Sequence, residues 1–139
     1  VSGNTFLYYV EGDPRQCVSP DCYVVKGVTN HRRPSFKVWE EGGRRPCFAL
    51  ELTSRSTRKN DLGEKMSTYR DDLGVAEYFL FDLTRDWVPE GLRGYRLEDG
   101  VYQPIAPDDR GRLQSVELDL ELAIVGKQLR FFAPGAAEP

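Results

Sequence analysis

Two apolar runs joined by one helical pattern constrain the fold of this chain more than any other feature. Residues 47–53 (CFALELT) and 76–83 (AEYFLFDL) are almost continuously apolar, which is typical of strands buried on both faces. The segment between them has helical periodicity. A strand, a helix and a second strand within 37 residues match the requirements of a right-handed parallel crossover. The sequence therefore predicts a mixed α/β sheet that contains this crossover.

The helix of the crossover has recognisable start and stop signals. Asp61 fits an N-cap, with Glu64 three residues later as the reciprocal member of a capping box, and Gly74 is a stop signal. Four residues at helical spacing form the expected core-facing stripe: Leu62, Met66, Tyr69 and Leu73. Tyr69 is therefore interpreted as a packing residue rather than a catalytic one.

Further strands are expected on both sides of the crossover. Residues 5–10 and 22–28 have strand composition and are expected to form a hairpin-like pair. The polar stretch 29–46 is long enough for a mobile loop or flap, although SFKVWE (35–40) could hold a short strand. Near the C-terminus, Asp99-Gly100 predicts a tight hairpin, and residues 113–132 are expected to extend the edge of the sheet.

The size of the chain favours one domain. Its 139 residues, 40% of them hydrophobic, can supply a single core without disulfides or a structural metal. We expect this domain to cover residues 1–132 and a flexible tail to follow over 133–139. The three cysteines predict buried thiols rather than a disulfide framework or zinc ribbon. No apolar run is long enough for a membrane-spanning helix and the N-terminus lacks a signal-peptide pattern, so a cytoplasmic location is expected.

Charge is distributed unevenly along the chain. The net charge is −3, but residues 26–59 hold nine basic and three acidic residues, a local charge of +6 that leaves −9 elsewhere. A basic patch that contacts an anionic partner is one interpretation. Ordinary solvated loop charges are the other, since the acidic pI of 5.3 is unusual for a domain dominated by nucleic-acid contacts.

One acidic residue conflicts with its surroundings. Glu51 interrupts the apolar run 47–53, where an unpaired carboxylate would cost several kcal/mol unless it had a partner, a metal ion or access to solvent. Asp21 stands at the start of another expected strand, and Lys65 borders the apolar stripe of the helix, from which it could reach Glu51. Two carboxylates can bind a hard divalent cation, and a nearby lysine can orient a water or stabilise charge on a phosphoryl oxygen. This combination suits phosphodiester hydrolysis.

Each of these residues also has a purely structural interpretation. Asp21 could cap a turn after Ser-Pro, Glu51 could lie at a sheet edge or pair with an arginine, and Lys65 could be a solvated lysine paired with a neighbouring acid. His31 is the only histidine, which excludes a histidine-based triad or a multi-histidine metal site within one chain. The chain also lacks the glycine and lysine spacing of a phosphate-binding loop.

Three blocks carry a resemblance to a known family. SPDCYVV, FALELTSRSTRKND and EKMSTYRDDLGVAEYFLFD resemble the Uma-type restriction endonucleases of the PD-(D/E)XK nuclease superfamily, and the resemblance extends from about Asn4 to Phe132. It implies a restriction-endonuclease-like α/β fold. Members generally have a helix before the first strand. The sequence as given begins directly before that strand, so we expect a domain without this helix, either lost or truncated.

The resemblance also implies roles for individual residues. Asp21 and Glu51 match the two acidic metal ligands, and the backbone carbonyl of Leu52 would be a third ligand. The superfamily lysine normally stands two residues after the second acid, where this chain has Thr53. In the Uma-type pattern the following helix supplies the lysine, which Lys65 matches.

The resulting hypothesis is an endonuclease that depends on Mg²⁺ or Mn²⁺ and acts on DNA. Arg55, Arg58 and Lys59 are the expected contacts to backbone phosphates, and a homodimer is plausible because a double-strand cut needs two sites. The alternative is a non-catalytic domain of nuclease fold that binds a protein or nucleic acid. A small-molecule-binding domain is a third interpretation, and it would show an apolar pocket without convergence of the two acids and the lysine.

Overall fold

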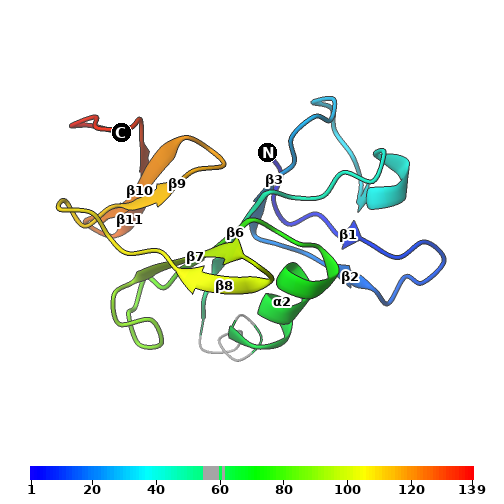
Figure 1. The fold of residues 1–139 in the computed structure, drawn as a ribbon, viewed down its shortest axis with the longest axis horizontal. Coiled ribbons are helices and arrows are strands. Elements are labelled where there is room, and N and C mark those ends of the chain that lie inside the picture. Colours follow the sequence, from blue (N-terminus) through cyan, green and yellow to red (C-terminus); the bar gives the residue numbers. More distant parts are fainter. Residues whose placement is uncertain (55–59, 61) are drawn as a thin grey trace.

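The computed structural model describes residues 1–54, 60 and 62–139, and its main element is a five-stranded sheet in the order β3-β5-β6-β7-β8 (Figure 1). The strands are β3 (Cys22–Val24), β5 (Phe48–Leu52), β6 (Glu77–Phe81), β7 (Leu92–Glu98) and β8 (Val101–Pro104). β5 and β6 are parallel, whereas the other neighbours are antiparallel. The parallel pair confirms the predicted crossover and the mixed sheet.

The crossover helix is short. α2 (Glu64–Ser67) is a single α-helical turn that continues directly into the π-helical turn η2 (Thr68–Asp72). Tyr69 and Leu73 of the predicted stripe are buried and Met66 packs against them, but Leu62 is exposed, so only the later part of the stripe faces the sheet. The helix ends before Gly74, whose φ of +58° is the left-handed conformation expected of a stop signal. Asp61, the predicted N-cap, lies outside the described residues.

The N-terminal segment forms a small sheet of its own, in the order β2-β1-β4. Its strands are β1 (Leu7–Tyr8), β2 (Cys17–Val18) and β4 (Phe36–Lys37), and β4 leads into the 3₁₀ turn η1 (Val38–Glu40). β4 confirms the short strand predicted within residues 35–40. The predicted pairing of residues 5–10 with 22–28 is wrong: the turn after β1 returns the chain at once to β2, and β3 instead pairs with β5.

The C-terminal segment also differs from expectation. β9 (Leu113–Ser115), β10 (Leu120–Val125) and β11 (Gln128–Phe132) form a separate antiparallel sheet, the C-terminal sheet, rather than an extension of the central sheet. It packs one apolar face against the central sheet, which buries side chains that edge pairing would leave in solvent. After β11 ends, the N–H of Gly135 contacts Glu121 and the carbonyl of Ala136 accepts a hydrogen bond from Arg112.

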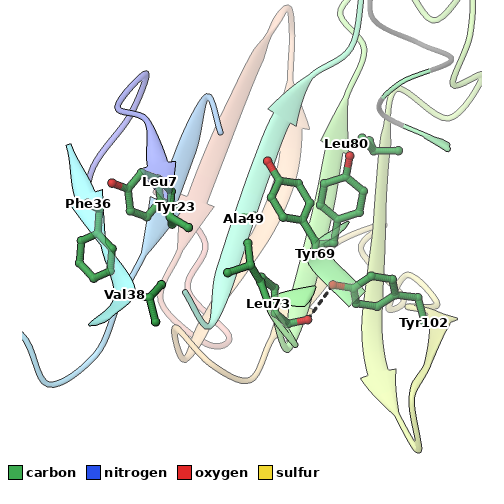
Figure 2. Packing of buried hydrophobic residues seen from close by; sticks show 11 residues of the cluster. Leu7, Tyr23, Phe36, Val38, Ala49, Tyr69, Leu73, Leu80 and Tyr102 are labelled. Atoms are coloured by element: carbon green, nitrogen blue, oxygen red, sulfur yellow. Dashed lines mark hydrogen bonds between the residues drawn. The ribbon is translucent and has the colours of Figure 1, made fainter. Parts of the chain in front are cut away.

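Two hydrophobic cores cover the two faces of the central sheet. The helix-side core, shown in Figure 2, consists of Leu7, Tyr23, Phe36, Val38, Ala49, Tyr69, Leu73, Val75, Tyr78, Leu80 and Tyr102. The second core joins the central and C-terminal sheets and consists of Phe48, Leu50, Phe79, Leu92, Leu113 and Leu122. Successive residues of β5 therefore alternate between the two cores. The continuous apolar run in the sequence reflects this burial on both faces.

Three smaller predictions are also tested by the structure. Asp99 and Gly100 have φ values of +50° and +77° and join β7 to β8, which confirms the tight hairpin. The cysteines are free, but all three are half-buried rather than fully buried. No helix among the described residues is long and apolar enough to cross a membrane.

Candidate active site

Glu51 lies in the centre of the molecule, on the face of β5 that the crossover helix covers. Only 1% of its surface is exposed. Its strand has β3 on one side and β6 on the other, so the interpretation of Glu51 as an edge residue is wrong. Because Ala49, two residues earlier, belongs to the helix-side core, the alternation of a strand directs Glu51 to the same face. A buried carboxylate at this position requires partners.

The crossover helix supplies two of these partners. The hydroxyl of Tyr69 donates a hydrogen bond of 2.5 Å to Oε1 of Glu51, and Nζ of Lys65 lies 3.4 Å from Oε2. Lys65 is largely buried, with 21% of its side chain exposed. Lys65 is thus paired with Glu51, so the partner of Glu51 is a lysine rather than an arginine. Asp61, one of the neighbouring acids considered for Lys65, lies outside the described residues.

Asp21 joins the site from the neighbouring strand. It directly precedes β3, and its Oδ2 accepts a hydrogen bond of 2.7 Å from the backbone N–H of Leu52. The carboxylate therefore contacts the next strand, one residue beyond Glu51, instead of merely capping its own turn. The structure brings together Asp21, Glu51 and Lys65, which are far apart in the sequence.

The electrostatics of the site favour a bound cation. The pKa of Glu51 is raised to about 7, mainly by burial and also by the adjacent Asp21 carboxylate, while Tyr69 and Lys65 oppose the shift. The carboxylate form of Glu51 is thus only partly stabilised by its protein partners. A cation placed between Asp21 and Glu51 would stabilise it further.

The donor set fits a hard divalent cation such as Mg²⁺ or Mn²⁺ better than a softer ion such as Zn²⁺. Among the described residues there is no group of three or more histidine, cysteine, aspartate or glutamate side chains that could hold a metal. The available protein ligands are therefore carboxylate oxygens of Asp21 and Glu51, with the peptide of Leu52 beside them. Mg²⁺ is commonly held by one or two carboxylates and keeps several waters. Two carboxylates are enough for such a site.

Comparison with known families agrees with this arrangement. The chain matches the family model Uma2, described as "Putative restriction endonuclease", over residues 1–127. The chain belongs to the Uma2 family. This confirms the family resemblance and places the chain in the restriction-endonuclease-like superfamily. No curated protein is similar enough to the chain to count as a match.

Within this Uma2 domain, the helix supplies the lysine that the strand lacks. Thr53 occupies the position two residues after Glu51, is buried, and has no hydrogen-bond partner for its hydroxyl among the described residues. Lys65 reaches Glu51 from α2 instead. Arg55, Arg58 and Lys59, the expected phosphate contacts, lie outside the described residues.

Tyr69 is the site residue that the sequence analysis missed. It belongs to the helix-side core, as predicted, but it also holds the Glu51 carboxylate. Tyr69 lies in the π-helical turn, a wide and rare form that is frequent at functional sites. A signal was present in the sequence, because Tyr69 stands four residues after Lys65 and the two side chains must share one face of the helix.

Proposed function

We propose that this Uma2 domain is a metal-dependent endonuclease that hydrolyses phosphodiester bonds in DNA. The observation that carries the proposal is the convergence of Asp21, Glu51 and Lys65 at one end of the central sheet. Convergence of two carboxylates and a lysine has a clear use in phosphodiester chemistry, and a domain that needed only stability could fill the position of Glu51 with an apolar residue. Membership of the Uma2 family, whose model is described as "Putative restriction endonuclease", also supports the proposal.

In the proposed mechanism, Asp21 and Glu51 would hold Mg²⁺ or Mn²⁺ through their carboxylate oxygens, and the Leu52 carbonyl would be a further ligand. When bound, such an ion lowers the pKa of a coordinated water and neutralises charge on the phosphate. The ammonium of Lys65 orients the attacking water and stabilises negative charge on a phosphoryl oxygen. Tyr69 keeps the Glu51 carboxylate in a fixed orientation, as partners of metal ligands commonly do.

The substrate and the assembly are part of the same proposal. Arg55, Arg58 and Lys59 follow the Glu51 strand in the sequence and would contact backbone phosphates, so binding should weaken steeply as salt increases. A homodimer would provide the two sites that a double-strand cut requires. Binding that is unchanged between low and moderate salt would count against the phosphate contacts.

Cleavage of supercoiled plasmid and of labelled single strands, with Mg²⁺ or Mn²⁺, tests the proposed activity. We expect Glu51→Gln and Lys65→Ala each to lower the rate about 100-fold or more. Lys127→Ala, which removes an exposed lysine in the β10–β11 turn, is the matched control and should cleave at the parent rate. A folded parent chain that cuts neither substrate with either metal would instead favour the non-catalytic domain.

A further inference from the structure

Thr53 carries a buried hydroxyl that forms no hydrogen bond within the described part of the chain. Only 7% of the residue is exposed, and its Oγ1 has no partner there. Nε of Arg96 is also buried without a partner, but the same guanidinium donates to the carbonyl of Gln114. An unpartnered buried hydroxyl destabilises a fold, and a valine of the same shape would not have this cost. The hydroxyl of Thr53 therefore indicates a use other than packing.

Thr53 lies on the same face of the central sheet as Glu51. Its N–H donates a hydrogen bond of 2.9 Å to the carbonyl of Phe81, so the pairing of β5 with β6 continues one residue beyond the end of β5. Side chains of a paired strand alternate between its two faces, and each residue adds about 3.3 Å to its length. The Thr53 side chain thus stands about 7 Å beyond Glu51 on the helix-covered face. Leu52, between them, points to the opposite face and is exposed.

The other groups of the candidate site reach the same end of β5. Oδ2 of Asp21 accepts a hydrogen bond of 2.7 Å from the N–H of Leu52, the residue between Glu51 and Thr53. Nζ of Lys65 lies 3.4 Å from Oε2 of Glu51. A water that forms hydrogen bonds on two sides joins groups about 5.5 Å apart. One water can therefore connect the groups around Glu51 with the Thr53 hydroxyl.

The proposed reaction needs a hydrogen-bond acceptor that Thr53 can supply. The direction of an attacking water is fixed when one of its hydrogens is donated to an acceptor. Lys65 cannot accept, because an ammonium has donors only. The Tyr69 hydroxyl is fully buried and gives its hydrogen to Glu51, and both carboxylates are assigned to the cation. A threonine hydroxyl has two acceptor lone pairs, and no group in the described chain uses those of Thr53.

We infer that the Thr53 hydroxyl accepts a hydrogen bond from the attacking water and, together with Lys65, directs this water toward the scissile phosphate. This inference rests on the proposed endonuclease function and adds a catalytic residue to it. Thr53 takes no proton from the water, since its hydroxyl only fixes the direction of attack.

Stability without metal tests whether the hydroxyl lacks a partner in the fold. Thr53→Val keeps the shape of the side chain and removes the hydroxyl, so its midpoint of urea unfolding in EDTA should equal or exceed that of the parent. Thr84→Val is the matched control, because the Thr84 hydroxyl donates a hydrogen bond of 2.8 Å to Asp82 and the midpoint should fall when it is removed. An equal fall in Thr53→Val would reveal a structural partner and overturn the inference.

Single-turnover cleavage of DNA with Mn²⁺ tests the role of Thr53 in the reaction. Thr53→Val should cleave about 10-fold to 100-fold more slowly than the parent, because a misplaced water reacts more slowly. Thr53→Ser, which restores the hydroxyl, should recover most of the lost rate, and Thr84→Val should cleave at the parent rate. The affinity of Thr53→Val for DNA, measured by fluorescence anisotropy in EDTA, and for Mn²⁺, measured by calorimetry, should equal that of the parent.

The outcomes separate this inference from the proposed function. Cleavage by Thr53→Val at the parent rate would refute the role of Thr53 and leave the endonuclease standing. A loss of DNA affinity would assign the hydroxyl to a phosphate contact, and a loss of Mn²⁺ affinity would assign it to the metal ion; either result would overturn the inference. A folded parent chain that cuts no DNA would refute the endonuclease and, with it, the role of Thr53.

Discussion

At the scale of single residues, Glu51 lowers the stability of the fold at the same position where the proposed activity needs a carboxylate. Its carboxyl is buried, and burial raises its pKa to about 7 from an ordinary value of 4.5. The folded protein therefore holds the Glu51 proton more tightly than the unfolded chain does. Without a cation, ionisation of Glu51 makes the native state less stable, which is the cost of a carboxylate at a buried position.

Glu51→Gln should change how stability depends on pH. In the parent chain, the free energy of unfolding should fall by about 3 kcal/mol as pH rises from about 4.5 to about 7, because the folded state binds the Glu51 proton over this range and the unfolded state does not. Glutamine does not titrate, so the variant should lack this fall. Urea unfolding in EDTA across this range measures the effect. Identical slopes for both proteins would contradict the assigned pKa.

Tyr69→Phe isolates the hydroxyl that holds Glu51. Phenylalanine keeps the ring and its place in the helix-side core, so the variant should fold, with the free energy of unfolding lowered by about 1–3 kcal/mol. Because Glu51 loses an orienting partner, metal affinity should fall about 10-fold to 100-fold. Titration with Mn²⁺ followed by calorimetry measures this affinity. Tyr8→Phe, which removes a hydroxyl from β1 instead, serves as the comparison and should bind Mn²⁺ normally.

Among the elements, the β6–β7 connection is organised around one carboxylate. Asp82 follows β6 and is buried, and its oxygens accept hydrogen bonds from the backbone N–H groups of Thr84, Trp87 and Val88. Burial alone would raise the pKa of Asp82, but these hydrogen bonds hold it below its usual value. This network fixes the loop that joins β6 to β7.

Asp82→Asn should therefore destabilise the fold by about 2 kcal/mol at neutral pH, since the amide replaces an acceptor oxygen and its charge is lost. The stabilisation from Asp82 is present above the ordinary pKa of 3.8 and is lost as pH falls through the lowered folded value. The difference between parent and variant should thus shrink in strong acid. Urea unfolding at pH 7 and pH 3 tests this. Asp99→Asn in the exposed hairpin turn is the control, and an equal effect there would contradict the prediction.

The elements differ in how far the sequence predicts them. β5 and β6 are predictable because continuous apolar runs identify strands buried on both faces, and the β7–β8 hairpin because Asp99-Gly100 favours a specific turn. The pairing partner of β1 is not predictable from the sequence, because a strand of two residues carries little pairing information. Tertiary contacts decide which strand pairs with β1. The same holds for the C-terminal sheet, whose alternating pattern fits either an edge or a separate layer.

The residues of the candidate site likewise differ in how far the sequence predicts them. The order of Asp21, Glu51 and Lys65 in the sequence was sufficient to predict that they converge. The contribution of Tyr69 was not predicted, because a tyrosine in an apolar stripe already satisfies the pattern of a core residue. Whether its hydroxyl also reaches a carboxylate depends on the π-helical turn, which the periodicity does not indicate.

In the whole molecule, separate buried hydrogen bonds on the two faces of the central sheet fix the start of β6 and the residues just before it. Glu77 of β6 is buried beneath the C-terminal sheet and accepts hydrogen bonds from the Ser115 hydroxyl and the Val116 N–H. On the opposite face, the hydroxyl of Tyr102 binds the carbonyl of Val75 beneath the helix (Figure 2). The C-terminal sheet is thus fixed to the start of β6 and β8 is fixed to the residues just before it, so we expect stability gained at the candidate site to extend to the whole fold.

Divalent cations should raise the melting temperature of the whole domain. A ligand that binds only the native state at a hundred times its Kd adds about 2.7 kcal/mol, or a rise of about 10 °C for a chain of this size. Differential scanning fluorimetry with Mg²⁺, Mn²⁺ and EDTA measures the shift. Glu51→Gln should abolish it and Lys127→Ala should keep it. An equal rise in Glu51→Gln would assign the cation to another site.

The hydrogen bond between the Asp21 carboxylate and the N–H of Leu52 is expected to form late in folding. It joins positions 31 residues apart, and Lys65 must then arrive from the crossover helix. Contacts between distant parts of a chain form slowly, because the intervening loop must first close. Catalytic competence should therefore be absent from any partly folded chain and emerge only when the sheet is complete, so that DNA cleavage during refolding would time the last steps of assembly.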